Sequence, residues 1–216
     1  MERILWYFAD PMCSWCWGFA PVIEQLVPQY RERIPISLVV GGLQPGTTEA
    51  LSTASRDEIF HHWHDVHKLT VQPFKFDNAL PEGFVYNTEP ACRAAVTIPQ
   101  LDPQATFPYF IRLQQAFYQQ GEDITQQETL ASIAEEFEID KKTFVEQWLS
   151  AEINEKTQRN FEMTRQYGVR GFPTLIMQDK HEAKVLTHGY SNLETIQPLL
   201  DSWLLESEQR SQQAEG

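Results

Sequence analysis

A pair of cysteines between a strand-like and a helix-like segment constrains this chain more than any other feature. The pair stands in Cys13-Ser14-Trp15-Cys16, after the apolar run at 4–8 and before the apolar run at 19–26. Two cysteines at this spacing either cycle between dithiol and disulfide or supply half of a tetrahedral zinc site. Unpaired N–H groups and the dipole at a helix N-terminus stabilise the thiolate of the first cysteine, which is the reactive form. The position of the pair therefore favours a redox site.

Size and composition fit either one substantial core or a core plus an inserted subdomain, since the chain has 216 residues and 42% hydrophobic residues. No apolar segment approaches the length of about 20 residues that crosses a bilayer. The formal charge of −13, with 17 basic residues that form no cluster, argues against a nucleic-acid partner. One cysteine pair plus one isolated cysteine suits a reducing compartment, and the first residues do not read as a secretion signal. We therefore expect a cytoplasmic protein without a membrane or nucleic-acid partner.

The first half of the chain predicts a βαβ unit followed by a helical block. Residues 4–9, 15–30 and 36–42 read as strand, helix and nearly continuous apolar strand. The next hundred or so residues lose the strand pattern and carry helix signals instead. One of these is a capping box that opens at Ser55. A helical domain is therefore expected between two parts of a sheet.

The last part of the chain returns to strands. Residues 174–178 and 184–188 are short apolar runs around a polar turn, consistent with an antiparallel hairpin, and a final helix follows Asn192. The segment Gly171-Phe172-Pro173-Thr174 stands directly before this hairpin. A proline cannot donate a ladder hydrogen bond, so it must sit at the first strand position or in a special turn. Cysteine pair and proline segment together are far more specific than either motif alone.

With both motifs in view, the chain resembles the DsbA family of the thioredoxin superfamily. It is most similar to the FrnE-like branch, which is related to 2-hydroxychromene-2-carboxylate isomerases and kappa-class glutathione transferases. The resemblance rests on the segments 10–19, 87–94 and 169–174. It implies an α/β thioredoxin fold, in which a central mixed sheet is flanked by helices and a large helical domain is inserted after the first βαβ unit.

The order of strand and helix signals, together with this resemblance, gives the expected boundaries, and the tail is predicted because residues 206–216 lack a hydrophobic period. The boundaries are 1–48 for the first part of the thioredoxin fold, 49–167 for the inserted helical domain, 168–205 for the second part of the fold, and 206–216 for a disordered tail.

The resemblance also implies roles for individual residues. Cys13 is the nucleophile, Cys16 the resolving thiol, and Pro173 a cis-proline that packs against the disulfide. The residue before that proline pairs its backbone with an extended substrate in such folds. The candidate substrate-binding residues are Trp15, Phe172, Trp17 and Asn87.

The implied function is thiol–disulfide exchange, with protein disulfide isomerisation as one form of it. The redox-active disulfide itself replaces any required cofactor, and glutathione is a candidate co-substrate. Expected substrates are disulfide-containing proteins or small thiols. Both a monomer and a homodimer remain open.

Two other functional classes stay open beside this one. A glutathione-dependent isomerase or kappa-class-like transferase is the first, but such relatives usually carry serine in place of Cys13 and lack Cys16. The second is a metal-binding module. The chain has no second CxxC, and His61, His64 and His67 lack the HExxH spacing and are interpreted as a polar helix face, so no metal site is predicted. Cys92 is interpreted as a small buried residue, with a second redox centre as the alternative.

Overall fold

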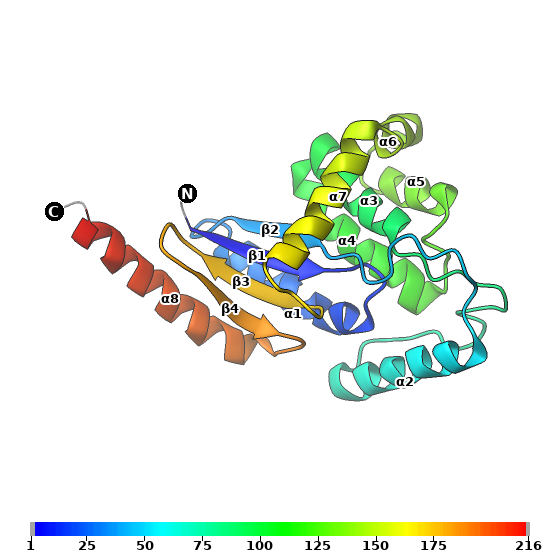
Figure 1. The fold of residues 1–216 in the computed structure, drawn as a ribbon, viewed down its shortest axis with the longest axis horizontal. Coiled ribbons are helices and arrows are strands. Elements are labelled where there is room, and N and C mark those ends of the chain that lie inside the picture. The colour runs from blue at the N-terminus through cyan, green and yellow to red at the C-terminus, as the bar shows by residue number, and fades with distance from the viewer. Residues whose placement is uncertain (1–2, 215–216) are drawn as a thin grey trace.

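The computed structural model, which describes residues 3–214, confirms the predicted fold class (Figure 1). A first unit of β1 (Ile4–Ala9), α1 (Ser14–Tyr30) and β2 (Ile36–Val40) is followed by a helical block. The block comprises α2 (Thr53–Thr70), α3 (Glu89–Leu101), a 3₁₀ turn at Pro103–Ala105, α4 (Thr106–Gln114), a π-helical segment at Gln115–Gln120, α5 (Gln127–Glu135), α6 (Lys141–Trp148) and α7 (Ala151–Gln166). The chain then forms β3 (Thr174–Gln178), β4 (Ala183–His188) and α8 (Leu193–Ala214).

The sheet has the order β2-β1-β3-β4, which places β1 between a parallel and an antiparallel neighbour. Tyr7 of β1 lies opposite Leu38 in the parallel pair and opposite Leu175 in the antiparallel pair. The hairpin of β3 and β4 completes the sheet on one side. Because β1 is central and runs directly into the cysteine pair, the sheet fixes where that pair lies.

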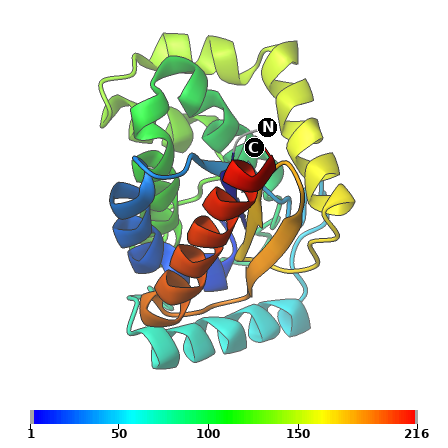
Figure 2. The same ribbon diagram turned by 90° about the vertical axis from the view of Figure 1, so that its left-hand side faces the viewer.

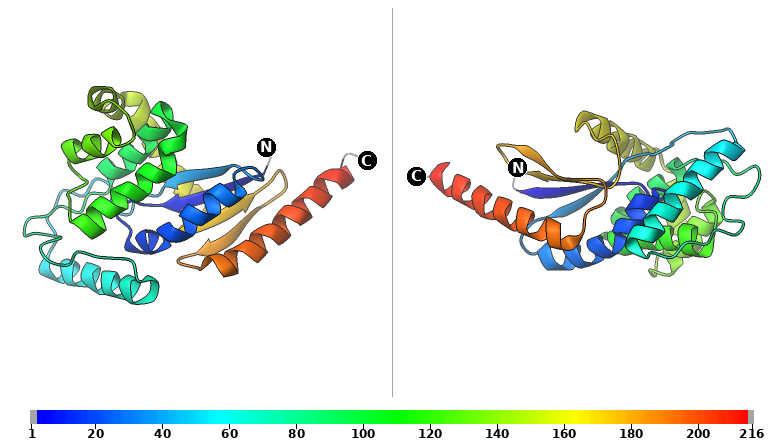
Figure 3. Two further views of the ribbon diagram at one scale, coloured as in Figure 1. Left: turned by 180° about the vertical axis from the view of Figure 1, so that it is seen from behind. Right: turned by 90° about the horizontal axis from the view of Figure 1, so that it is seen from below.

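Alternation along β1 sends its side chains to two different layers. Leu5 and Tyr7 belong to the main core with the buried face of α1, whereas Phe8 packs in a second cluster with Met163 of α7 and with Tyr167, the C-cap residue of that helix. The views from the front and from behind show α7 and α1 on opposite faces of the sheet (Figures 1 and 3). The sheet is therefore covered on both sides, as its apolar strands require.

Helix α2 lies apart from α3–α6 and next to α1 (Figure 3). Gly18 of α1 permits this close approach, since a Cβ there would lie 2.8 Å from Cγ1 of Val66. The buried Trp63 lies on the same face of α2, one turn before Val66, and packs among aromatic rings, with its ring centroid 5.1 Å from that of Tyr118 and 5.4 Å from that of Phe74. The rings that follow α2 in the long loop thus form part of the core.

The start of α2 differs from the prediction. Ser52, not Ser55, is the N-cap residue, and its side-chain oxygen accepts a hydrogen bond of 3.1 Å from the amide of Ser55. Serines at both positions satisfy the sequence rule for a cap. The pattern therefore located the helix but placed its first residue three positions too late.

The expectation of a disordered tail from residue 206 is wrong, because α8 continues to Ala214 (Figure 2). The buried carboxylate of Asp179 accepts hydrogen bonds from Ser207 at 2.9 Å and from Arg210 at 2.8 Å. Polar anchors rather than a hydrophobic period hold this end of the helix, which is why periodicity missed it. Residues 215 and 216 of the predicted tail lie outside the described residues.

Candidate active site

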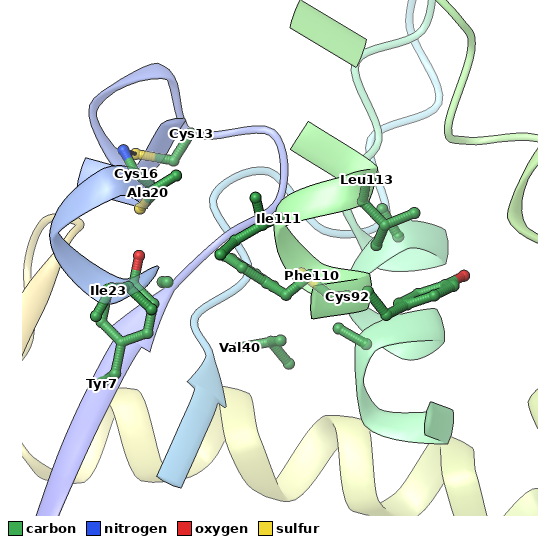
Figure 4. Close-up of a cluster of buried hydrophobic side chains, with 14 of the residues drawn as sticks. Tyr7, Cys13, Cys16, Ala20, Ile23, Val40, Cys92, Phe110, Ile111 and Leu113 are labelled. Atoms are coloured by element: carbon green, nitrogen blue, oxygen red, sulfur yellow. Dashed lines mark hydrogen bonds between the residues drawn. The ribbon is translucent and has the colours of Figure 1, made fainter. Parts of the chain in front are cut away.

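The end of β1 places Cys13 at the N-terminus of α1, where it is the N-cap residue. Its sulfur accepts a hydrogen bond of 3.4 Å from the amide of Cys16 and donates one of 3.5 Å to the carbonyl oxygen of Phe172. Both cysteines carry free thiols and lie side by side at the start of the helix (Figure 4). An N-cap side chain that receives a helix N–H is well placed to carry negative charge.

The two thiols differ in access and in ease of ionisation. Cys13 keeps 6% of its surface exposed, whereas Cys16 is completely buried. Burial raises the pKa of Cys16, and its hydrogen bond to Cys13 and the charges of Cys13 and Asp10 raise it further. The site therefore presents one thiol to the outside and holds the other back as a neutral thiol.

The loop before β3 closes over the cysteines. The peptide bond between Phe172 and Pro173 is cis, and Pro173 is buried. The Thr174 hydroxyl donates to the carbonyl of Gly171 at 2.8 Å, and the Gly189 amide donates to the carbonyl of Pro173 at 2.7 Å. The loop is thus tied to β4 on one side and contacts Cys13 on the other.

The ring of Phe172 fills the space above the backbone that follows β2. A Cβ on Gly41 would overlap this ring, lying 2.8 Å from Cε2 and nearer still to Cζ. Only a residue without a side chain leaves room for the ring there. Gly41 therefore helps to fix the position of the Phe172 loop relative to Cys13.

A groove of about 400 Å³ opens beside Cys13. Its walls come from the start of α1, from α2, from the segment after β2 and from the Phe172 loop. The apolar lining residues are Met12, Trp15, Leu43, Leu51, Ile59, Trp63 and Phe172, and the polar ones include Gln44, Ser55, Glu58 and His62. An apolar groove with a few polar groups, open at a reactive sulfur, has the character of a substrate site.

The structure separates the four candidate substrate-binding residues into two pairs. Trp15 and Phe172 line the groove, and Trp15 also packs against Tyr190 with ring centroids 6.5 Å apart. Trp17 is 3% exposed and donates from Nε1 to the carbonyl of Pro73 at 3.0 Å. In this geometry Trp17 holds the loop after α2 in place.

Asn87 is not among the residues that line the groove, but it holds backbone next to it. Its side-chain oxygen accepts hydrogen bonds from the amides of Gly46 at 2.8 Å and Glu89 at 3.1 Å. The neighbouring Thr88 hydroxyl accepts from the amide of Gln44 at 3.1 Å. Gln44 lines the groove. The Asn87 and Thr88 side chains therefore fix the backbone of the segment that forms this part of the groove wall.

Asp10 is a buried carboxylate directly behind the cysteine pair. It accepts hydrogen bonds from the amides of Met12 at 2.8 Å and Leu43 at 2.6 Å and from the Cys92 thiol at 3.3 Å. Burial raises the pKa of Asp10 more than these bonds lower it. Cys92 is fully buried, as expected from its apolar helix face, and the sequence did not reveal that it contacts Asp10. Together these contacts join α3 to the active-site loop.

Two tyrosines near the cysteines escaped the sequence reasoning. The Tyr86 hydroxyl donates to the carbonyl of Met12, and the Tyr7 hydroxyl points to Cys16 (Figure 4). Burial raises the pKa of both tyrosines. The alternation of β1 could have placed Tyr7 on the same side as α1, whereas Tyr86 lies in a loop without a periodic pattern.

Within residues 3–214, no group of three or more His, Cys, Asp or Glu side chains is arranged to hold a metal ion. None of the helices there is both long and apolar enough to span a membrane.

The amino-acid sequence matches the model of a known protein family over most of its length. The family described as thioredoxin matches residues 6–198, which include the cysteine pair and the proline loop. The chain belongs to the thioredoxin family. The same fold is found in solved structures described as DsbA oxidoreductases, which share 12% and 13% sequence identity with this chain.

Two solved structures illustrate the likeness. A candidate protein disulfide isomerase from Nitrosomonas europaea is 42% identical, with a TM-score of 0.90 over 95% of this chain and 99% of that one. The cytosolic disulfide reductase DsbM from Pseudomonas aeruginosa is 23% identical, with a TM-score of 0.76 over 93% and 98%. A structure of DsbM with glutathione gives a TM-score of 0.75. Fold and neighbours are those of an oxidoreductase.

Two curated relatives are more distant in sequence. The ClpXP adapter protein SpxH from Halalkalibacterium halodurans is 22% identical over 193 residues, which are 85% of this chain. SpxH from Shouchella clausii is 20% identical over 202 residues. The chain spans 62% and 66% of the lengths of these two relatives.

Proposed function

We propose that this thioredoxin-family chain is a thiol–disulfide oxidoreductase that uses Cys13 and Cys16 as a dithiol/disulfide couple. The observation that carries the proposal is the geometry of Cys13. Its sulfur caps α1, borders the groove, and lies within 3.5 Å of the Phe172 carbonyl and 3.4 Å of the Cys16 amide. A reachable sulfur with a buried second thiol beside it has the arrangement that disulfide exchange requires.

In the reducing direction, the Cys13 thiolate attacks one sulfur of the substrate disulfide. A new S–S bond joins Cys13 to that half of the substrate, and the other half leaves as a thiolate that takes up a proton. Cys16 then loses its proton and attacks the Cys13 sulfur, which forms the Cys13–Cys16 disulfide and releases the second half as a thiol. Two electrons pass from the protein dithiol to the substrate, and the reverse sequence oxidises a substrate dithiol.

The groove supports substrates that present an apolar group beside a disulfide. Met12, Trp15 and Phe172 supply apolar surface around Cys13, and Phe172 also offers its backbone next to the reacting sulfur. Pro173 is proposed to fix that backbone against the cysteine pair. Proteins with an exposed disulfide and small disulfides both fit a groove of this size.

Glutathione is proposed as the small thiol that returns the Cys13–Cys16 disulfide to the dithiol. The likeness to DsbM, which has been solved with glutathione, supports this choice, and the name of DsbM as a cytosolic reductase supports a cytoplasmic site of action. A glutathione-dependent isomerase or transferase has less support, because a resolving cysteine is present behind the nucleophile. A catalyst that needs only one thiol has no use for Cys16.

The test is turnover with a disulfide substrate such as insulin, with glutathione and glutathione reductase supplying electrons. Wild-type protein is expected to accelerate reduction, and Cys13→Ser to abolish the acceleration. Cys16→Ser is expected to accumulate a mixed disulfide at Cys13 that mass spectrometry detects. Cys92→Ser serves as the matched control, since it changes a buried cysteine outside the couple and keeps a donor for Asp10. Full activity of Cys13→Ser would refute the proposal, and full turnover by Cys16→Ser without an adduct would favour the glutathione-dependent isomerase.

A further inference from the structure

The resolving thiol of Cys16 sits in a pocket that resists its ionisation. Its side chain is fully buried, and the carboxylate of Asp10 lies near enough to oppose a second negative charge. Yet Cys16 has to act as a thiolate in the second half of the proposed reaction. Burying an unpaired charge is costly, so a group that faces the sulfur and stabilises its charge is needed.

Two groups of β1 and its continuation that carry a donor hydrogen lie beside the Cys16 sulfur. The hydroxyl of Tyr7 points to it from the middle of the strand (Figure 4), and the nearness of the two groups raises the pKa of Tyr7. The backbone amide of Asp10 faces it from just beyond the strand. Tyr7 is only 1% exposed and its ring packs against Phe19 and Phe110 with centroids 5.9 and 6.1 Å away, so its hydroxyl has little freedom to turn elsewhere.

We infer that the Tyr7 hydroxyl is the donor that stabilises the Cys16 thiolate during resolution of the mixed disulfide. This inference rests on the proposed function and adds a residue to its second step. The titratable groups around Cys16 are Cys13, Asp10 and Tyr7. Cys13 is bonded to the substrate at that stage and Asp10 carries the wrong charge, which leaves Tyr7 as the side chain that favours the thiolate.

The chemistry balances without any further reactant. Cys16 gives up its proton and attacks the Cys13 sulfur, so that the Cys13–Cys16 bond forms as the bond to the substrate breaks. The leaving substrate sulfur takes both electrons of the broken bond and a proton. Tyr7 keeps its own proton throughout and donates only a hydrogen bond, which is shortest and strongest when the acceptor is charged.

The two steps can be timed in one stopped-flow experiment with reduced protein and 2,2′-dithiodipyridine. Attack by Cys13 releases a first equivalent of pyridine thione, and attack by Cys16 releases a second. In Tyr7→Phe we expect the first release to stay within about twofold of wild type and the second to slow by about tenfold, since hydrogen bonds to charged groups are among the strong ones. The second release should also need a higher pH. Tyr109→Phe is the matched control, because it removes an equally buried hydroxyl, bonded to the carbonyl of Leu130, and should leave both steps unchanged.

The outcomes separate this inference from the function on which it rests. Wild-type protein that releases only one equivalent overturns the proposed dithiol mechanism and the role of Tyr7 with it. Two equivalents from wild type, with equal second steps in Tyr7→Phe, overturn the role of Tyr7 alone. If Tyr7→Phe does not fold, 3-fluorotyrosine at position 7 keeps the ring and makes the hydroxyl a stronger donor. A faster second step then supports the inference, and an unchanged one overturns it.

Discussion

Replacement of Gly41 by alanine tests whether the Phe172 loop controls the reactivity of Cys13. Gly41 does not adopt a positive φ, and its amide donates to the carbonyl of Ala9 at 2.7 Å, so alanine fits the backbone there. The added methyl group meets the Phe172 ring at 2.8 Å or less. Favourable carbon–carbon contacts begin at about 3.5 Å, so the ring has to retreat by about 1 Å or more.

The size of the effect follows from this displacement. Overpacking of a buried contact costs about 1–3 kcal/mol, so the free energy of unfolding should fall by that amount. The retreat of the ring also moves the Phe172 carbonyl, which lies 3.5 Å from the Cys13 sulfur. A shift of about 1 Å in an active site can lower a rate by about 100-fold, and we expect the first thiol-exchange step of Gly41→Ala to slow by about 10- to 100-fold.

The assay compares stopped-flow rates and urea denaturation for Gly41→Ala and Gly171→Ala. Gly171 lies in the same loop, but its nearest neighbour would be 3.7 Å from an added Cβ, so this control should behave as wild type. The double variant Gly41→Ala/Phe172→Ala removes the clashing ring and should recover part of the lost stability. The steric reasoning is refuted if Gly41→Ala keeps both the rate and the stability of wild type.

Two further predictions concern buried polar contacts away from the reacting sulfurs. Cys92→Ala removes a donor to Asp10 and should lower the free energy of unfolding by about 1–2 kcal/mol in denaturant titration. Cys92→Ser should lower it less, because the serine hydroxyl still donates to Asp10. Equal losses of stability in the two variants would contradict this role of Cys92. Although burial raises the pKa of Asp179, hydrogen bonds led by Arg210 hold it well below the ordinary value. The stabilisation from its carboxylate is therefore complete above the ordinary pKa of about 3.9 and fades as pH falls towards the lowered pKa. The gap in unfolding free energy between wild type and Asp179→Asn should accordingly be constant above about pH 5 and narrow below about pH 4, and a gap that widens there would contradict the assignment.

The sequence predicts well which segments form this site, because the strongest signals in the sequence are local. Strand β1 and the cysteine pair follow each other directly, so the position of Cys13 at a helix start follows from the order of residues alone. The proline before β3 cannot continue the ladder pattern, and the resemblance to the DsbA family implied the site roles of Phe172 and Pro173. Whether the loop reaches Cys13 depends on the pairing of β1 with β3, which only the structure gives.

The remaining parts depend on contacts that sequence patterns do not encode. Trp17 stands beside the cysteines in the chain, yet the turn of the helix points it into the core, where its nitrogen binds the carbonyl of Pro73. Asp10 shows how a charged residue can be buried without an ion pair, through amides from two distant segments and the thiol of Cys92. The continuation of α8 depends on Asp179, which is far away in sequence. Each of these is a long-range polar contact.

The most direct test of the account is the redox state of the cysteines after equilibration with reduced and oxidised glutathione, measured by alkylation and peptide mass spectrometry. Cys13 and Cys16 are expected to lose their thiols together and to appear as one linked peptide in oxidised protein, while Cys92 stays alkylatable after denaturation. An intramolecular disulfide that includes Cys92, or the absence of any Cys13–Cys16 link under oxidising conditions, would contradict the central claim.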